Sequence, residues 1–264
     1  MFVALPRLQP RFYSISSSNK LCPKEVSVSV GVLKATTSAG QSIEGVCSHY
    51  LAGLQPQSDR AKVSVVTSTF RLPEKTESPL LMVGAGTGLA PMMGFLADRE
   101  LDLSQGARLG PIHLFFGCRT EHDFIYEDKI RHYEKIGMIK CHLALSRPPD
   151  QNEKMYVQHR LAKMGKELCE LLQNPDTHYY VCGDARMADS CFESCVSVLR
   201  EHGCMSRVWA VQKLKTMRLE GRWQTDVWGI VSHFEEAKKS IEKKKKTAAK
   251  LWLKHLKGGD NDED

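Results

Sequence analysis

The chain has 264 residues, of which 42% are hydrophobic, and a formal net charge of +6. This length allows one large domain or two modest ones, and no run of residues approaches the ~20 apolar positions of a membrane helix. The mild positive charge suits an anionic ligand or an acidic partner and does not indicate nucleic acid. Nine cysteines without a CxxC pair or a secretory signal favour free thiols in a reducing compartment and no metal site.

The residues before position 77 predict β-structure interrupted by one short helix. Alternating or continuous apolar residues predict strands over 26–33 and 61–67. The polar, turn-rich stretch 36–45 predicts a loop, and 46–54 suits a helix that ends before Pro56. This part of the chain therefore indicates a small domain that is mostly β.

Residues 78–91 combine a buried strand, a glycine-rich turn and the start of a helix. The apolar run 80–83 is typical of a parallel strand that is covered on both faces. Glycines alternate through 84–88, and without a Cβ they let a phosphate approach the backbone N–H groups. Pro91 suits the first turn of a helix, whose N-terminus binds anions. A plain tight turn gives the same pattern, so pyrophosphate binding depends on the neighbouring segments.

From this stretch onward, strands alternate with helices. Such alternation predicts a doubly wound parallel sheet with crossover connections. The expected strands are 80–83, 112–117, 139–145 and 178–182, and the expected helices are 90–101, 124–136, 157–172 and 187–202.

Residues 11–18 (RFYSISSS) place a cation beside an aromatic ring, which suits a ligand with a phosphate and a flat heterocycle. This stretch resembles the FAD-binding strand of the diflavin reductases, and 45–51 resembles their second flavin motif. The resemblance implies that Arg11 neutralises a phosphate of FAD, Tyr13 stacks on the isoalloxazine ring and Ser14 hydrogen-bonds near N5. At a helix start, the donors to the FAD pyrophosphate would be Gly45, Val46 and Ser48.

The second half continues in the order of this family. Residues 84–91 resemble its pyrophosphate loop, 115–119 its next strand end, and 146–158 its segment for the adenosine 2′-phosphate. Two cations, a hydroxyl and a phenol at a strand end suit a phosphate dianion, whereas an NAD site requires a carboxylate for the ribose. NADPH is therefore favoured over NADH. The implied nucleotide ligands are Gly86, Thr87, Gly88, Arg119, Ser146, Arg147, Lys154, Tyr156, Gln158 and Asp184.

Four positions match the place where nicotinamide and flavin meet in this family. The resemblance implies catalytic roles for Ser14, Cys182 and Asp226, with the ring of Trp228 covering the flavin. The implied chemistry is hydride transfer from NADPH to FAD, in which the protein mainly positions two rings. The alternative interpretation of Trp228 is a core anchor near the end of the chain.

The resemblance also organises the chain into three parts. We expect an α/β plus β fold, with a partial antiparallel FAD-binding β-barrel over 1–76 and an NADP(H)-binding domain over 77–229. The barrel is expected to be incomplete, in an N-terminally truncated chain, because the family usually has strands before Arg11. Residues 230–264 read as a Lys-rich helical tail with an acidic end, either solvated or facing a membrane surface or an acidic partner.

The leading hypothesis is the FAD/NADPH half of an NADPH–haemoprotein reductase. It would pass electrons to an FMN-binding domain or protein, or to a haem or iron–sulfur protein. The alternatives are a stand-alone enzyme similar to ferredoxin–NADP reductase and a non-catalytic NADP(H)-binding remnant. We expect a cytoplasmic location, including a membrane surface reached through a partner. A mitochondrial one is less favoured, although the first 20 residues have no acidic side chain, as in transit peptides.

Overall fold

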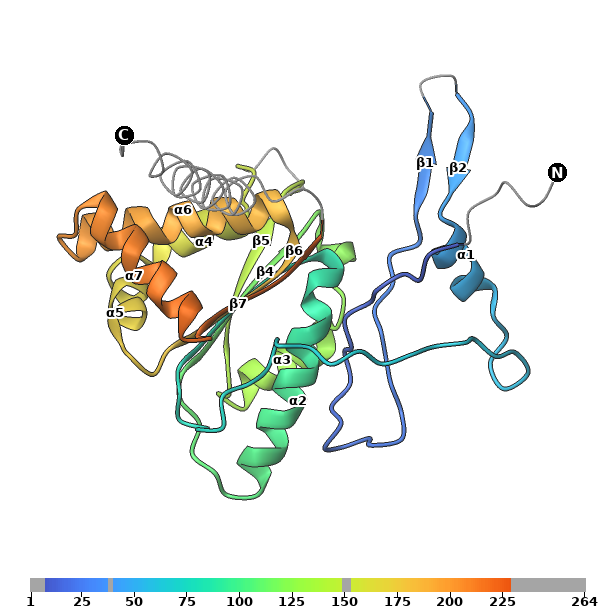
Figure 1. Cartoon of the computed structure of the whole chain (residues 1–264), viewed down its shortest axis with the longest axis horizontal. Helices are drawn as coiled ribbons and strands as arrows, with labels where there is room; N and C mark the ends of the chain where they lie inside the picture. Colours follow the sequence, from blue (N-terminus) through green and yellow to red (C-terminus); the bar gives the residue numbers. More distant parts are fainter. Residues whose placement is uncertain (1–7, 38–39, 149–152, 229–264) are drawn as a thin grey trace, which may run out of the picture.

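The computed structural model describes residues 8–37, 40–148 and 153–228, and its main body is a parallel sheet covered by helices (Figure 1). Along these residues, no helix is both long and apolar enough to cross a membrane. The elements are β1 (Lys34–Thr36), β2 (Ser42–Glu44), α1 (Val46–Gly53), β3 (Leu80–Ala85), η2 (Gly86–Leu89), α2 (Ala90–Ser104), β4 (Ile112–Cys118), η3 (Glu121–Asp123), α3 (Glu127–Lys135), β5 (Lys140–Leu145), α4 (Val157–Met164), α5 (Lys166–Gln173), β6 (His178–Asp184), α6 (Ala185–His202), α7 (Arg207–Leu219) and β7 (Trp223–Trp228).

The main sheet has five parallel strands in the order β5-β4-β3-β6-β7. The chain enters at the central strand β3, moves outward through β4 and β5, and then returns to the other side of β3 as β6 and β7. The direction of winding therefore reverses between β3 and β6. In sheets of this kind, ligands bind beyond the carboxyl ends of the strands at this switch point.

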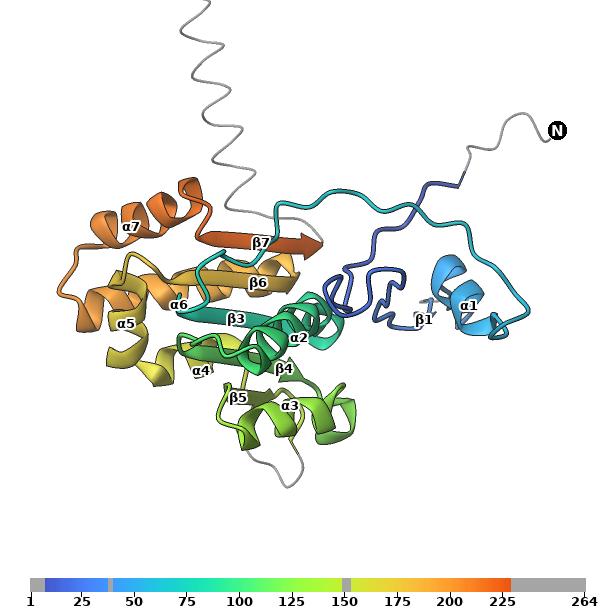
Figure 2. The same cartoon turned by 90° about the horizontal axis from the view of Figure 1, so that it is seen from below.

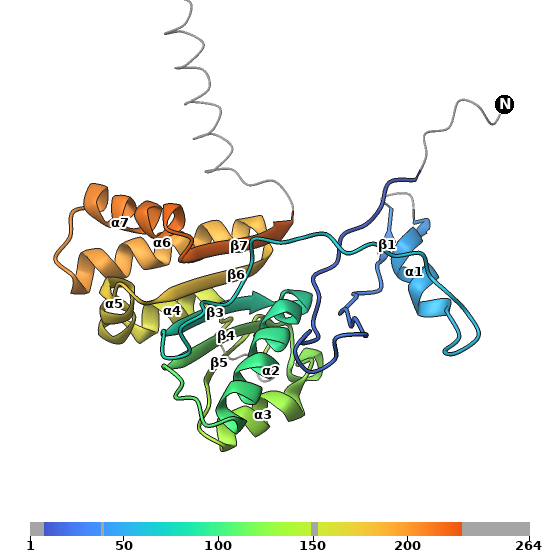
Figure 3. The same ribbon diagram turned by 60° about the horizontal axis from the view of Figure 1, so that its bottom comes forward.

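Helices cover both faces of the sheet, which confirms the predicted doubly wound arrangement (Figures 2 and 3). Side chains alternate along β3, so Leu80 and Met82 pack in one core with α2 and α3, while Leu81 and Val83 pack in the other with α4, α6 and α7. All four are fully buried. Burial on both faces explains why β3 reads as a continuous apolar run.

The β-structure before residue 77 is smaller than the sequence predicts. The strands expected over 26–33 and 61–67 are wrong, because the first contributes only the isolated bridge Ile15–Val28 and the second is irregular. The antiparallel hairpin of β1 and β2 instead overlaps the predicted loop 36–45, and β1 begins two residues before it. Within the described residues, the expected barrel is thus reduced to one hairpin and one bridge. Helix α1 agrees with the prediction.

Missing partners explain these errors. Val63 and Val65 alternate as in a strand, yet their side chains are 84% and 70% exposed. Apolar alternation shows that a segment can form a pleated edge, but the hydrogen bonds must come from a second strand. No other described segment supplies them.

The predicted helix 157–172 is also interrupted. Gly165 has φ +53° and separates α4 from α5. A Cβ on Gly165 would lie 3.1 Å from Nε2 of His202, at the end of α6. The break therefore combines a backbone conformation that favours glycine with a close tertiary contact.

A pair of histidines, one buried and one half-buried, lies between β4 and β5. Nδ1 of His113 lies 3.1 Å from Nε2 of His142, and Nε2 of His113 lies 3.6 Å from the carboxylate of Glu167, which also pairs with Lys140. Burial lowers the pKa of His113 to about 4, the Glu167 carboxylate opposes this shift, and His142 and Lys140 add to it. His113 is therefore neutral in the folded protein at neutral pH.

This depressed pKa predicts acid sensitivity of the fold. An unfolded histidine titrates near 6.5, so below that pH the unfolded state binds more protons than the folded one. The contribution of neutral His113 to the free energy of unfolding is therefore complete above pH ~6.5 and is lost as the pH falls toward 4. At pH 5 the loss from His113 alone is about 2 kcal/mol. Urea unfolding at pH 7.5 and pH 5 measures this loss. His113→Phe should reduce it, whereas His122→Gln, at an exposed position of η3, should not; equal pH dependence in all three proteins would contradict the assignment.

Candidate active site

The glycine turn after β3 packs directly against β6. Gly86 has φ +53°, and a Cβ on Gly88 would lie 2.2 Å from the carbonyl oxygen of Cys182. Only a residue without a side chain at position 88 allows this approach. The turn thereby brings the start of α2 beside the carboxyl ends of β3 and β6. A helix start of this kind binds an anionic group through its backbone N–H groups.

We expect Gly88→Ala to destabilise the protein by about 3 kcal/mol, because the methyl group would overlap the backbone of β6. Gly86→Ala is the matched control in the same turn. A Cβ there meets no atom within 4 Å, so its cost is only the left-handed backbone, about 1 kcal/mol. Chemical denaturation of both variants measures the difference, and equal destabilisation would show that the contact with β6 is unimportant.

Three side chains that are distant in sequence meet at the carboxyl end of the sheet. Cys182 and Asp226 are register partners on β6 and β7. The hydroxyl of Ser14 donates to Oδ2 of Asp226 at 2.5 Å, and the thiol of Cys182 lies 3.8 Å from the same oxygen. The structure thus brings together three of the four predicted catalytic residues around one carboxylate oxygen.

The thiol of this group is neutral. Cys182 is fully buried, and burial together with the charge of Asp226 raises its pKa to about 12. A thiolate nucleophile requires a depressed pKa instead. Cys182 is therefore a small polar contact at this site and not a nucleophile.

The fourth predicted residue, Trp228, ends β7 as the register partner of Asp184 on β6. Trp228 is 48% exposed, so it is not a core anchor. Asp184 caps α6 by accepting a hydrogen bond from the backbone N–H of Arg186 at 2.9 Å, and hydrogen bonding to the Arg186 side chain lowers the pKa of Asp184. An aromatic ring and a carboxylate thus border the site at the end of the sheet.

The residues of the predicted flavin motifs lie outside the parallel sheet. Tyr13 is half-buried and hydrogen-bonds to Cys47 on α1, which raises the pKa of Tyr13. The exposed side chain of Arg11 donates to the carbonyl of Gln9 at 2.5 Å. The predicted strand over 11–18 is wrong, because this irregular stretch has a single bridge, at Ile15, yet it leads from these two side chains to Ser14 and Asp226.

The second motif surrounds the start of α1. The hydroxyl of Ser48 donates to the carbonyl of Gly45 at 3.2 Å and accepts from the N–H of Leu33 at 3.1 Å. A Cβ on Gly45 would lie 2.8 Å from Cβ of Leu33. These contacts hold Gly45, Val46 and Ser48 against the chain that leads into β1, and Ser48 already has two partners there.

The predicted 2′-phosphate residues gather at the ends of β4 and β5. The N–H of Arg147 donates to the carbonyl of Arg119 at 2.7 Å, and Ser146 N–H donates to Cys118 at 3.0 Å, so the two strands stay paired beyond their ends. The N–H of Met155 donates to Leu145 at 2.9 Å, which returns the chain to the same edge. This edge carries three exposed cations and the start of α4, namely Arg119, Arg147, Lys154, Tyr156 and Gln158.

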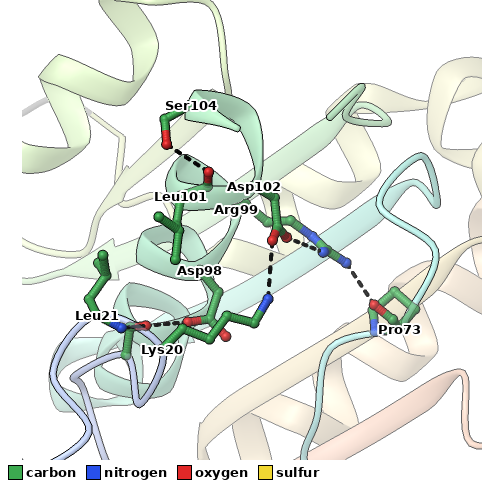
Figure 4. Close-up of polar contacts among 9 residues, drawn as sticks. Lys20, Leu21, Pro73, Asp98, Arg99, Leu101, Asp102 and Ser104 are labelled. Carbon is green, nitrogen blue, oxygen red and sulfur yellow. Dashed lines mark hydrogen bonds and ion pairs between the residues drawn. The ribbon is translucent and has the colours of Figure 1, made fainter. Parts of the chain in front are cut away.

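Sequence reasoning missed a polar cluster that joins the N-terminal segment to α2 (Figure 4). Ser18 donates to Asp98, and Lys20 pairs with Asp102 at 3.1 Å. The usable signal was the spacing of Asp98 and Asp102, which places both carboxylates one helical turn apart on one face of α2.

Comparisons with known proteins agree with this geometry. Residues 82–192 match the family model of the oxidoreductase NAD-binding domain, and residues 1–50 match that of the FAD binding domain. The chain is 42% identical over 229 residues to the NADPH–cytochrome P450 reductase of Drosophila melanogaster, and 40% identical over 228 residues to that of Musca domestica. It is 36% identical over 232 residues to that of Homo sapiens.

These matches cover 85% of this chain and between 33% and 34% of each relative. The chain therefore spans about a third of the length of the curated relatives it matches. The FAD-binding and NAD-binding matches fall on the two parts of the structure that Ser14 and Asp226 join. The chain belongs to the diflavin reductase family, in which it corresponds to the C-terminal FAD- and NAD-binding module of the NADPH–cytochrome P450 reductases.

Proposed function

We propose that the chain is a flavoprotein oxidoreductase module that uses NADPH and FAD, of the NADPH–haemoprotein reductase type. The observation that carries this proposal is the hydrogen bond between Ser14 of the flavin motif and Asp226 of the parallel sheet, with Cys182 beside it. When bound, the two cofactors would supply hydride transfer from nicotinamide to flavin. The residues present suit both cofactors.

The nucleotide side of the site suits NADP(H). The turn at Gly86, Thr87 and Gly88 offers backbone N–H groups at the start of α2 to a pyrophosphate. Arg147 and Lys154 would neutralise the 2′-phosphate, since both are exposed cations at the same strand edge.

The flavin side of the site is formed by Arg11, Tyr13 and Ser14, with further backbone donors around Gly45. Asp226 holds the Ser14 hydroxyl in place, and the buried thiol of Cys182 lies beside the same carboxylate oxygen. These residues therefore orient the reacting rings and stabilise charge near them, and the protein itself supplies no nucleophile. Trp228 lies at the end of β7, where its ring would cover the flavin.

The electrons would then pass to an FMN-binding domain or protein, or to a haem or iron–sulfur protein. The relatives are named for cytochrome P450, so a haem protein is the final acceptor that we propose. We place this module in the cytoplasm or at a membrane surface reached through a partner, with the domain boundaries 1–76 and 77–229. The expected tail 230–264 lies outside the described residues.

A non-catalytic NADP(H)-binding protein is the second candidate. It is favoured by the small extent of β-structure before residue 77 and by the exposure of Val63 and Val65. Such a surface suits a flavin domain whose strands need further partners. A stand-alone reductase similar to ferredoxin–NADP reductase would differ from the leading proposal in reducing a separate carrier protein directly.

An absorbance spectrum of the purified chain separates these candidates. The chain is examined as isolated and after reconstitution with FAD, and NADPH is then added without oxygen. Flavin bands that bleach with NADPH are the expected result. A colourless protein that still binds NADP⁺ would support the non-catalytic candidate instead.

A further inference from the structure

We infer that a polar clasp on α2 positions the N-terminal segment 11–29, here called the flavin segment, and with it holds Ser14 against Cys182 and Asp226. The clasp joins Ser18 and Lys20 of the N-terminal segment and Pro73 of the connection into β3 to three residues of α2, namely Asp98, Arg99 and Asp102. Its role in electron transfer rests on the proposed function, whereas its role in placing Ser14 does not.

The first half of the clasp holds the N-terminal segment. The hydroxyl of Ser18 donates to Oδ1 of Asp98 and accepts from the N–H of Leu21 at 3.1 Å, and Ser18 is only 5% exposed. Nζ of Lys20 lies 3.1 Å from Oδ1 of Asp102. The chain around 18–21 is therefore fixed on α2 by a buried hydroxyl and an ion pair at once (Figure 4).

The second half holds the connection to the sheet. Arg99 is 2% exposed, and it donates to Asp102 at 2.8 Å and to the carbonyl of Pro73 at 2.8 Å. Burial would raise the pKa of Asp102, but hydrogen bonds from Arg99 and Lys20 outweigh it and lower that pKa. The carboxylate of Asp102 thus stays charged. Through Lys20 and Arg99 it links the flavin segment and the connection into β3 to one helix.

The same helix begins at the glycine turn. Residues 90–104 form one uninterrupted helix whose N-terminal half is buried in the core. A Cβ on Gly94 would lie 3.1 Å from the carbonyl oxygen of Ser17, so the flavin segment also runs closely across this helix. Helix α2 therefore connects the proposed pyrophosphate site at its start rigidly to the clasp about 12 Å farther along.

Apart from the clasp and the bond of Ser14 to Asp226, few contacts hold the flavin segment, among them the close approach of Ser17 to Gly94 and the bond from the N–H of Ser27 to the Ser17 hydroxyl at 3.0 Å. Its own backbone contacts are the bridge Ile15–Val28 and a few turn hydrogen bonds, and Ser29 adds one side-chain bond to Tyr126 at 2.6 Å. Ser14 lies only four residues before Ser18, within about 13 Å of extended chain. Releasing the clasp should therefore let Ser14 move away from Asp226, and a shift of about 1 Å between reacting groups costs up to ~100-fold in rate.

The test first uses the full chain without added cofactor. The Ser14 hydroxyl and the Cys182 thiol both contact Oδ2 of Asp226, so the departure of Ser14 should expose that thiol. In Ser18→Ala/Lys20→Ala, we expect about tenfold faster alkylation of Cys182 by iodoacetamide, followed by mass spectrometry, and faster amide hydrogen exchange at 14–18. Exchange in β3 to β7 should stay unchanged, which verifies that the variant folds. Lys20→Arg and Lys24→Ala, the latter an exposed lysine of the same segment, should resemble the wild type. Unchanged alkylation and exchange in the double variant would overturn the inference.

A second measurement adds FAD and NADPH. Flavin reduction in a single turnover should be about tenfold slower in Ser18→Ala/Lys20→Ala than in the wild type. The single variant Lys20→Arg, which keeps Ser18, should reduce flavin at the wild-type rate. NADP⁺ affinity should be the same in all three proteins. A released segment with an unchanged reduction rate would overturn the positioning role. A wild-type chain that does not reduce flavin would count against the proposed function alone, because the first measurement still decides whether the clasp places Ser14.

Discussion

Asp226→Asn is expected to slow flavin reduction by NADPH about 100-fold in a single turnover. The asparagine keeps the shape of the side chain and its contact with Ser14, but it removes the negative charge that lies 2.5 Å from the Ser14 oxygen and 3.8 Å from the Cys182 sulfur. NADP⁺ affinity should change little, because the predicted pyrophosphate and 2′-phosphate contacts lie elsewhere on the sheet edge. Stopped-flow absorbance of the flavin, with NADP⁺ titration alongside, measures both quantities.

Asp176→Asn is the matched control for this prediction. Asp176 precedes β6 at the opposite end of the sheet, where it pairs with Lys75 at 2.6 Å. The Asp176→Asn variant should therefore reduce flavin at the wild-type rate. Cys182→Ala should slow the reaction in the same direction as Asp226→Asn. Wild-type rates in both site variants would show that the meeting of these residues has no catalytic role.

The double variant Arg147→Ala/Lys154→Ala is expected to weaken NADP⁺ binding about 100-fold and to leave NAD⁺ binding nearly unchanged. A hydrogen bond to a charged group contributes about 1.5 kcal/mol, so two such contacts to the 2′-phosphate amount to about a factor of 100 in affinity. NAD⁺ has no 2′-phosphate and loses only a weak, general electrostatic attraction. Calorimetric titration with each nucleotide measures the two affinities.

A variant with the same change in charge provides the control. Lys129→Ala/Arg131→Ala removes two exposed cations from α3, and both nucleotides should then bind almost as they bind the wild type. If Arg147→Ala/Lys154→Ala weakens NADP⁺ and NAD⁺ equally, these two cations do not recognise the 2′-phosphate, and the proposed preference for NADPH loses its support.

The nucleotide half was predictable because its signals are local. Strand β3 is buried on both faces, so its apolar run appears directly in the sequence. Strands β4 and β6 are buried in the same way, and β4, β5 and β6 all lie within two residues of their expected bounds. Helix α7 was not assigned, although Ser206 caps its start by accepting from the N–H of Trp209 and is the kind of residue that marks a helix start.

The β-region was predicted less well because strand pairing depends on a partner far along the chain. The pattern at 61–67 is alternating, yet these residues are irregular in the structure. Gly165 shows a related limit, since its position inside a helical pattern was visible while its contact with His202 depends on the packing of α6.

By itself, the sequence determined the alternation of strands and helices after residue 77, the glycine turn and the family motifs, because each depends on residues close together in the chain. Only the tertiary structure decided that Ser14 and Cys182 contact the same carboxylate oxygen of Asp226. It also decided that α2 holds both the N-terminal segment, at Lys20, and the connection into β3, at Pro73. Those contacts join residues as far as 212 positions apart, and their energy appears only when the sheet, α2 and the N-terminal segment are packed together.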